Sequence, residues 1–278
     1  MQVREIIDLH RLGMGIKTLV MGIVNVTPDS FSDGGRFFDH NKAIAHAISL
    51  VESGADILDI GAESTRPGHQ PVLLEEEWQR LAPVLRQLRR EVSVPLSLDS
   101  FKAEVARRAV AEGVDIINDV WGGLADENMY DVIATTGVPY VLMHNSTLAP
   151  PQTGDIVPRV RDELLDLVAK AELKGVRRNQ IILDPGVGFG KTVQQNLQLI
   201  NGVDVLRSTG FPVLMGTSRK SVIGHVLGLP VDDRLEGTAA TVALSVVRGA
   251  DIVRVHDVKA MARIVAMCDA MVRSYVPS

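Results

Sequence analysis

Two basic residues near the C-terminus, Arg254 and His256, lie two positions apart at the end of the apolar run DIVRVHD. Residues two apart in a strand share one face, so we expect both side chains to point the same way. A guanidinium beside an imidazole can bind a polyanion such as a phosphate group. A solvated cluster of charges at a strand end is the simpler alternative, and the spacing alone does not exclude it.

A second group of polar residues, Asp99, Asn118 and Asp184, consists mainly of hydrogen-bond acceptors that follow apolar residues. None of the three has a basic neighbour in the sequence, and a buried carboxylate needs donors from somewhere. A ligand with adjacent N–H groups, such as an aminopyrimidinone, would supply a pair of donors to one carboxylate. Each residue taken singly could instead bond to backbone amides.

These residues belong to a larger pattern in which short apolar runs end on polar side chains. The runs are VMGIVNV, ADILDIGAEST, VPLSLDS, DIINDV, PYVLMHN, IILDPG, PVLMGTSRK and DIVRVHD. Helical, Gly-capped stretches lie between them, as in βα units around a parallel sheet. The pattern predicts an α/β fold, a (β/α)8 TIM barrel whose strand ends gather at one face to form the active site. We expect a single domain over residues 1–278, with a hairpin before the first strand.

The motif Gly-x-Asp-Ile recurs and places Asp56, Asp115 and Asp251 at the beginnings of strands. These positions correspond to the opposite face of a parallel barrel from the active site. We therefore expect the three carboxylates to be caps or turn partners. Trp78 lies on a helical apolar stripe and is expected to pack, not to stack on a ligand.

The composition excludes several classes of function. The net charge of −5 and the pI near 5.8 give no basic footprint for nucleic acid or an anionic membrane. We find no long apolar stretch and no signal-peptide pattern. The lone Cys268 cannot form an internal disulfide. A cytoplasmic protein that binds neither nucleic acid nor membrane is the expectation.

The segment DPGVGFGKT, residues 184–192, resembles a phosphate-binding loop but lacks its first glycine, because Pro185 stands there. Its glycines also fail the dinucleotide-binding spacing. Two further segments, Thr27 to Gly35 and Glu63 to Gly68, are rich in Gly, Ser, Pro and Asp and are typical of loops that close over a site.

Five ordered motifs, MGIVNVTPDSFSDGG, GAESTRPG, LDPGVGFGK, GTSRKS and RVHDV, resemble those of the dihydropteroate synthases of folate biosynthesis. The resemblance runs from about Thr18 to the C-terminal helix. It implies a (β/α)8 barrel, usually a homodimer. The implied transferase reaction joins 6-hydroxymethyl-7,8-dihydropterin diphosphate to p-aminobenzoate, giving 7,8-dihydropteroate and diphosphate with Mg²⁺ assisting. Sulfonamides, which imitate p-aminobenzoate, are the implied inhibitors.

The resemblance also implies roles for individual residues. Asn25 is the implied Mg²⁺ ligand. The implied diphosphate contacts are Thr65, Arg66, Arg254 and His256. The implied pterin contacts are Asp99, Asn118, Asp184 and Lys220. The implied border of the p-aminobenzoate site consists of Phe31, Pro67, Arg219 and Ser221. Lys220, Arg254 and His256 are the candidate catalytic residues.

Two departures from the usual motifs are visible. Gly61-Ala62 replaces a more familiar Gly-Gly pair, and the segment with His144 and Asn145 differs from the common His-Met-x-Gly. We assign no role to His144 or Asn145 from the sequence.

Three other functions are weighed against the synthase. A Schiff-base aldolase would use Lys220 as nucleophile, but Arg219 and Ser221 flank it in a polar segment and the reaction needs a desolvated lysine. A methyltetrahydrofolate-binding methyltransferase with a corrinoid partner would share the pterin pocket but would not need a diphosphate clamp. A non-catalytic pterin-binding paralogue is the non-enzyme alternative.

Overall fold

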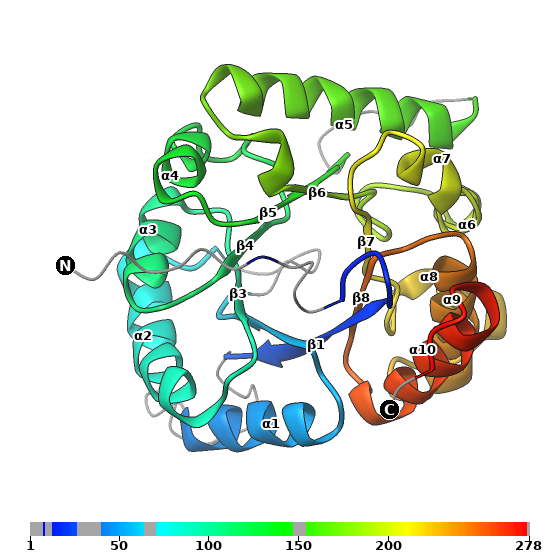
Figure 1. Cartoon of the computed structure of the whole chain (residues 1–278), viewed down its shortest axis with the longest axis horizontal. Coiled ribbons are helices and arrows are strands. Elements are labelled where there is room, and N and C mark those ends of the chain that lie inside the picture. The colour runs from blue at the N-terminus through cyan, green and yellow to red at the C-terminus, as the bar shows by residue number, and fades with distance from the viewer. Residues whose placement is uncertain (1–7, 9–12, 27–39, 64–70, 147–153, 277–278) are drawn as a thin grey trace.

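The computed structural model describes residue 8 and residues 13–26, 40–63, 71–146 and 154–276. Eight parallel strands lie in the order β6-β5-β4-β3-β2-β1-β8-β7 (Figure 1). They are β1 Leu19–Asn25, β2 Ile57–Gly61, β3 Leu96–Asp99, β4 Ile116–Asp119, β5 Tyr140–Met143, β6 Ile181–Asp184, β7 Leu214–Met215 and β8 Ile252–Val255. A parallel bridge between Leu183 and Val213 joins the two ends of the sheet. The predicted (β/α)8 barrel is confirmed.

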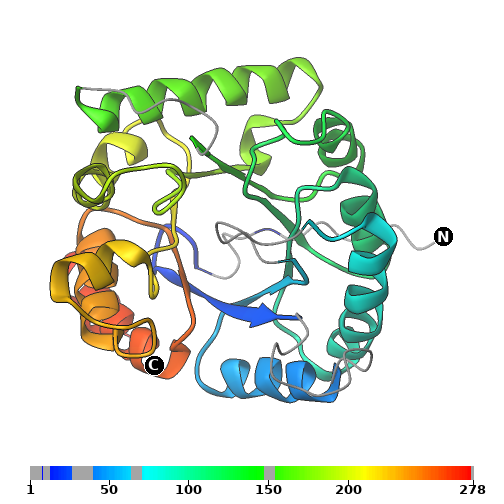
Figure 2. The same ribbon diagram turned by 180° about the vertical axis from the view of Figure 1, so that it is seen from behind.

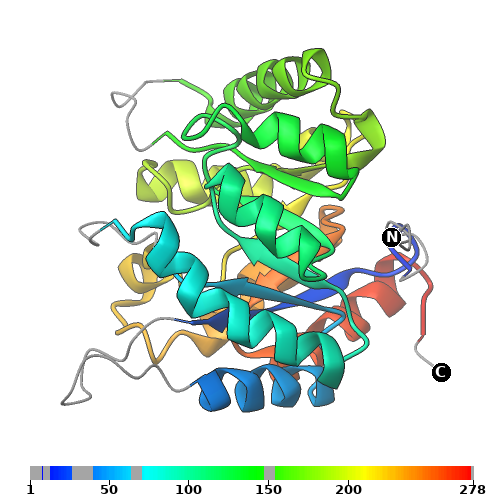
Figure 3. The ribbon, with the colours of Figure 1, turned by 90° about the vertical axis from the view of Figure 1, so that its left-hand side faces the viewer.

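Helices surround the strands, as both faces of the barrel show (Figures 1 and 2). They are α1 His40–Glu52, α2 Leu74–Glu91, α3 Ala103–Ala111, α4 Met129–Thr136, α5 Ile156–Leu173, α6 Val193–Asn201, α7 Val203–Arg207, α8 Ser221–Leu227, α9 Leu235–Val247 and α10 Val258–Val272. Figure 3 shows α2, α3 and α4 side by side along one flank. Trp78 on α2 packs against the outer core, as predicted. No helix of the described ranges is long and apolar enough to cross a membrane.

The inside of the barrel is layered, and this layering builds the site. A small apolar cluster fills its lower part: Met14, Leu19, Met21, Ile57, Ile116, Val141, Ile182, Leu214 and Ile252. Because side chains two apart on a strand share a face, the residues two positions after Ile57, Ile116, Ile182 and Ile252 also point inward. They are Asp59, Asn118, Asp184 and Arg254. A polar layer therefore rests on an apolar floor.

The aspartates at the strand beginnings hold neighbouring strands in register. Asp56 accepts a hydrogen bond from the backbone N–H of Val20 at 2.8 Å, and Asp115 accepts one from that of Leu96 at 2.9 Å. Asp251 does the same for Val213 at 2.9 Å. The predicted structural role of these three residues is confirmed.

Most of the predicted N-terminal hairpin lies outside the described residues. In the part that is described, Gly13 adopts a φ of 93° in a tight turn, which favours glycine. Met14 after it is 7% exposed and belongs to the apolar floor of the barrel. The segment before β1 therefore contributes to closing the lower end of the barrel.

Candidate active site

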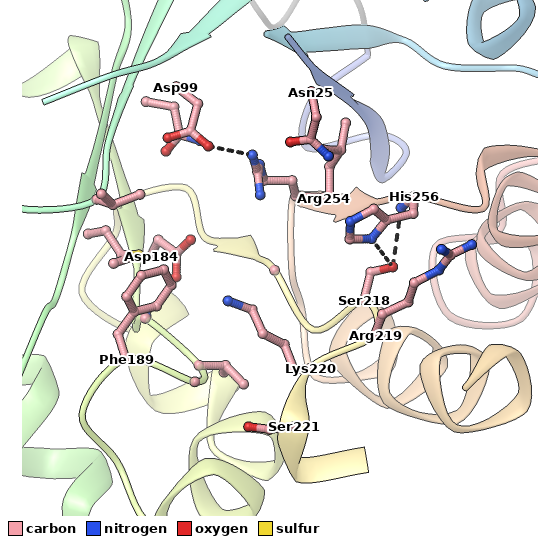
Figure 4. Close-up of a pocket in the computed structure, with 18 of the residues that line it drawn as sticks. Asn25, Asp99, Asp184, Phe189, Ser218, Arg219, Lys220, Ser221, Arg254 and His256 are labelled. Carbon is pink, nitrogen blue, oxygen red and sulfur yellow. Dashed lines mark hydrogen bonds and ion pairs between the residues drawn. The ribbon is translucent and has the colours of Figure 1, made fainter. Parts of the chain in front are cut away.

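A cavity of about 510 Å³ opens at the carboxyl ends of the strands, above the polar layer (Figure 4). Residues from or just after all eight strands line it. Among them are nine of the residues singled out from the sequence: Asn25, Asp99, Asn118, Asp184, Arg219, Lys220, Ser221, Arg254 and His256. The other four, Phe31, Thr65, Arg66 and Pro67, lie outside the described residues.

Arg254 is the centre of the polar layer. Its Nε donates to Asp59 Oδ2 at 2.6 Å. Its Nη2 donates to Asp99 Oδ2 at 2.6 Å, the bond drawn in Figure 4. Burial disfavours its charge, but Asp59 and Asp99 outweigh burial, so the pKa of Arg254 is raised. The guanidinium remains charged and is shared by two carboxylates. This differs from the sequence interpretation, in which Asp99 had no base beside it.

Asp99 carries less negative charge than an exposed aspartate would at neutral pH. Burial raises its pKa to about 7, against the opposing pull of Arg254, and the neighbouring Asp59 raises it further. The folded, ligand-free protein therefore holds this carboxyl close to half-protonated near pH 7. A ligand that donates N–H groups to Asp99 would favour the ionised form.

Asp59 is the member of the layer that the sequence reasoning missed. It lies in the middle of β2, fully buried, and its Oδ2 accepts from both Arg254 Nε and Asn118 Nδ2, the latter at 3.0 Å. Its neighbours Ile57, Leu58 and Ile60 are apolar, which is typical of a strand that is covered on both faces. A carboxylate within a doubly covered strand was the signal that could have identified it.

Asp184 is the last residue of β6, and a hydrogen bond to the loop after it holds its carboxylate. Oδ1 accepts from the backbone N–H of Gly186 at 2.7 Å, which fixes the side chain. Burial raises the pKa of this carboxyl, opposed by the Gly186 bond and by Lys220. Figure 4 shows the Asp184 carboxylate and the Lys220 amine pointing into the same space. The Lys220 Nζ also lies 4.2 Å from the centre of the Phe189 ring, a cation–π contact.

The loop after Asp184 is held by Lys191, the lysine of the apparent phosphate-loop motif. Its Nζ donates to the backbone oxygens of His144, Gly186 and Phe189 at 3.2, 2.9 and 3.1 Å. Burial lowers its pKa to about 7. Gly186 has a φ of 67°, and a Cβ there would lie 1.9 Å from the His144 oxygen. The motif is thus a structural loop that presents Asp184 and Phe189.

His144 and Asn145 also have structural surroundings. His144 is 4% exposed, and its Nε2 lies 2.5 Å from Glu163 Oε2 on α5. Burial lowers its pKa despite that carboxylate. Asn145 donates from Nδ2 to the backbone oxygen of Val120 at 3.0 Å. Neither residue lines the cavity, so both support the strand ends from behind.

Ser218 sets the orientation of the His256 ring. Its Oγ accepts from the His256 backbone N–H at 3.2 Å and lies 3.0 Å from His256 Nδ1 (Figure 4). The hydroxyl has a single proton, and donating it to Nδ1 leaves the ring proton on Nε2. In that tautomer His256 can donate a hydrogen bond to an anion from Nε2.

Arg219 is held by partners outside the polar layer. Its φ of 57° is unusual for a residue with a side chain, and its guanidinium pairs with both oxygens of Asp257 at 3.0 and 2.6 Å. Arg234, which the sequence reasoning did not single out, donates to the Arg219 backbone oxygen at 3.0 Å. Lys220 and Ser221 follow at the start of α8, so this turn sets their positions.

The site offers limited means of holding a metal ion. Among the described residues, no group of three or more His, Cys, Asp or Glu side chains could bind one. Asn25, exposed at the end of β1, contributes an amide oxygen to the cavity. Mg²⁺ commonly keeps several waters and binds one or two protein oxygens plus substrate phosphates, so this donor fits Mg²⁺ bound with a phosphorylated ligand.

Residues 21–256 match the family described as pterin binding enzyme. The dihydropteroate synthase of Bacillus subtilis (strain 168) is 50% identical over 256 residues, which are 92% of this chain and 89% of that protein. The structure is also similar to solved dihydropteroate synthases. The one from Clostridium difficile, in the presence of pteroic acid, has a TM-score of 0.88 and 46% identity, covering 92% of this chain and 97% of that one.

The Xanthomonas albilineans structure with 4-aminobenzoic acid has a TM-score of 0.87 and 44% identity, covering 94% of each chain. The Yersinia pestis structure, with a sulfonamide drug complex, has a TM-score of 0.87 and 36% identity, covering 97% of each chain. The similarity to each of these proteins extends over nearly the full length of this chain and of that protein.

Proposed function

The chain belongs to the dihydropteroate synthases of the pterin-binding enzyme family, and we propose that its cavity joins 6-hydroxymethyl-7,8-dihydropterin diphosphate to p-aminobenzoate. The reaction breaks the bond between the pterin methylene carbon and the diphosphate oxygen. A bond from the arylamine nitrogen to that carbon replaces it. The arylamine then loses a proton, and the products are 7,8-dihydropteroate and diphosphate.

The polar layer is the proposed pterin site, and this is the single observation that carries the proposal. Asp99, Asn118 and Asp184 present acceptors around one cavity above an apolar floor. The pterin edge carries adjacent N–H donors, so one carboxylate can accept two of them. The carboxylates also stabilise positive charge on the ring as the diphosphate departs.

The opposite side of the cavity suits the departing diphosphate. In the proposed arrangement His256 donates from Nε2, Lys220 provides a mobile ammonium, and Arg254 lies below them. Asn25 would hold Mg²⁺, which would supply charge neutralisation for the leaving group. Thr65 and Arg66 remain the further diphosphate contacts proposed from the motifs. Removal of one such donor is expected to reduce the rate by roughly 10²–10³.

The p-aminobenzoate would lie beside Arg219 and Ser221, with Phe31 and Pro67 as the contacts proposed from the motifs. Arylamines are nucleophilic without activation, so this site requires no Ser-His-Asp device. The Lys220 amine lies over the Phe189 ring, and its charge opposes the rise that burial causes in the pKa of the neighbouring Asp184 carboxyl. A Schiff-base nucleophile needs a desolvated lysine in apolar surroundings, so a lysine beside a carboxylate gives the aldolase alternative no support.

A homodimer is part of the proposal and has one observation behind it. The neighbouring helices α9 and α10 expose apolar side chains together, namely Leu244, Val247, Met267, Met271 and Val272. Such a patch on a monomer is typical of a protein interface. Analytical ultracentrifugation should give twice the 30.1 kDa mass of the chain. The cytoplasmic location stays a prediction.

The proposed reaction is tested by incubating the pure protein with the pterin diphosphate, p-aminobenzoate and Mg²⁺. Formation of dihydropteroate and diphosphate in equal amounts is expected. A corrinoid methyltransferase would instead require a methylated folate, and a non-catalytic paralogue would bind the pterin without forming product. Trapping of a carbonyl substrate by borohydride would indicate the aldolase.

A further inference from the structure

Asp59 is fully buried and does not line the cavity, yet it accepts hydrogen bonds from two residues that do. In the register of β1 and β2 it stands opposite Ile23, which faces the cavity, and it comes two residues after Ile57 of the apolar floor. Asn118 and Arg254, which line the cavity, are its hydrogen-bond donors. It is thus part of the polar layer but out of reach of a ligand.

The contacts of Asp59 are concentrated on one oxygen. Oδ2 accepts from Arg254 Nε at 2.6 Å and from Asn118 Nδ2 at 3.0 Å. Within the described part of the chain, Oδ1 is buried without a hydrogen-bond partner. A buried carboxylate that is only half satisfied opposes folding relative to an apolar side chain of similar size. Packing alone therefore does not account for an aspartate here.

The effect of Asp59 on Asn118 is to fix the direction of its amide. Asp59 Oδ2 accepts a hydrogen bond from Asn118 Nδ2, so the amide nitrogen is turned toward Asp59. The amide oxygen is then the atom that remains for a ligand in the cavity. Without Asp59, the amide could turn over and present its nitrogen, which would repel a ligand N–H donor.

The effect on Arg254 is to fix the plane of its guanidinium. Asp59 holds Nε while Asp99 holds Nη2, each at 2.6 Å. A planar fork held at two of its nitrogens has little rotational freedom left. Arg254 and Asp99 therefore keep their positions before the ligand arrives.

We propose that Asp59 is a positioning residue for pterin recognition, which turns Asn118 into a hydrogen-bond acceptor and orients Arg254 against Asp99. This inference rests on the proposed function, because it concerns how the same cavity recognises its substrate. It extends that function to a residue that never touches the substrate.

Two substitutions, Asp59→Leu and Asp59→Asn, separate the positioning role of Asp59 from the effects of its charge and of its packing. Asp59→Leu removes the acceptor and should weaken binding of 6-hydroxymethyl-7,8-dihydropterin roughly 10- to 100-fold, as expected for losing a charge-assisted hydrogen bond. Asp59→Asn can place its own amide oxygen where Oδ2 lies and accept from both partners. It should retain most of the pterin affinity of the wild type. Calorimetric titration measures the pterin affinity of both variants, and inorganic diphosphate is titrated as a second ligand.

Asp251→Leu is the matched control. Asp251 is equally buried and paired with an arginine, its Oδ2 lying 3.1 Å from Arg207 Nε, but at the opposite end of the barrel. Its loss should lower the unfolding temperature and leave the pterin affinity of the folded protein unchanged. A purely structural role for Asp59 would make Asp59→Leu behave in this same way and would overturn the proposal.

The double variant Asp59→Leu/Asn118→Asp tests the orientation of residue 118 directly. An aspartate there presents an oxygen to the ligand whichever way it turns, so pterin affinity should recover above that of Asp59→Leu. If Asp59→Leu does not fold, the double variant, which keeps one buried carboxylate near Arg254, is compared with Asn118→Asp. In that single variant two carboxylates face each other, so the double variant should bind the pterin more tightly.

No recovery in the double variant, or equal losses in Asp59→Asn and Asp59→Leu, would contradict the proposal. Titration of the wild type distinguishes a failure of the proposed function from a failure of the proposed role of Asp59. If the wild type itself neither binds the pterin nor forms dihydropteroate, the proposed function fails. If the wild type binds and Asp59→Leu binds as well, only the role of Asp59 fails.

Discussion

Asp99 and Arg254 form an ion pair of 2.6 Å inside the barrel, although 155 residues separate them in the chain. Asp99 ends β3 and Arg254 lies in β8, so only closure of the barrel brings them together. The pair gives the proposed pterin pocket a fixed cation beside one of its proposed acceptors. Burial raises the pKa of Asp99 against the pull of Arg254, so the charge state of this carboxyl differs between the folded and unfolded chains.

The first prediction concerns the pH dependence of stability. The Asp99 carboxyl has a pKa of about 7 when folded, against a usual value of 3.8. Between these values the folded protein binds a proton that the unfolded chain does not. The stabilising contribution of Asp99 is therefore complete below about pH 3.8 and is lost as the pH rises through about 7.

Asp99→Asn removes this titration. The unfolding free energy of the variant relative to the wild type should rise between pH 4 and 7 by up to about 1.4 kcal/mol per pH unit. Urea unfolding at a series of pH values measures it. Asp131→Asn, at an exposed position on α4, should give a curve parallel to that of the wild type. A parallel curve for Asp99→Asn would refute the raised pKa.

The second prediction concerns Asn25 as a metal ligand. Asn25→Ala should reduce the affinity for inorganic diphosphate in the presence of Mg²⁺ by at least about tenfold, since hard cations bind oxygen ligands. Binding of the pterin without its diphosphate should change little. Titrations of both ligands, each with and without Mg²⁺, separate the effects, and Asn145→Ala is the control outside the cavity. Equal losses for the two ligands would argue against a metal role.

The third prediction concerns the order of binding. In the described part of the cavity, the p-aminobenzoate side has Arg219 and Ser221, and its other proposed contacts come from the motifs around Phe31 and Pro67. We expect pterin diphosphate with Mg²⁺ to complete this side and exclude water from the pterin methylene. A sulfonamide should then compete with p-aminobenzoate and bind poorly to the ligand-free protein. Tight binding of a sulfonamide to ligand-free protein would rule out this order.

Much of the fold followed from local patterns in the sequence. Glycines before β-branched runs, polar strand tips and aspartates at strand beginnings are short-range signals, and each predicted its element correctly. The convergence of Asp99, Asn118, Asp184 and Arg254 on one cavity also followed, because parallel strands end on the same face. These inferences needed only the alternation of side chains along a strand.

The partners of these residues could not be predicted in the same way. Which carboxylate pairs with Arg254 depends on the stagger of the closed barrel, which no single strand encodes. The role of Lys191 depends on its loop folding back so that three carbonyl oxygens meet its amine. The inward direction of Asp59 was not predicted because its neighbours Leu58 and Ile60 are apolar. Their side chains pack in the core between the barrel and the helices, so the strand reads as apolar although its inner face is polar.

The central claim is that the acceptors on the apolar floor recognise the pterin, and calorimetry on Asp184→Asn tests it most directly. The amide oxygen of the variant can still accept the 2.7 Å bond from Gly186, so the loop should stay in place. Its amide nitrogen then faces the pterin donors. We predict a normal unfolding temperature and at least about a 100-fold loss of affinity for 6-hydroxymethyl-7,8-dihydropterin. Unchanged affinity in the folded variant would contradict the account.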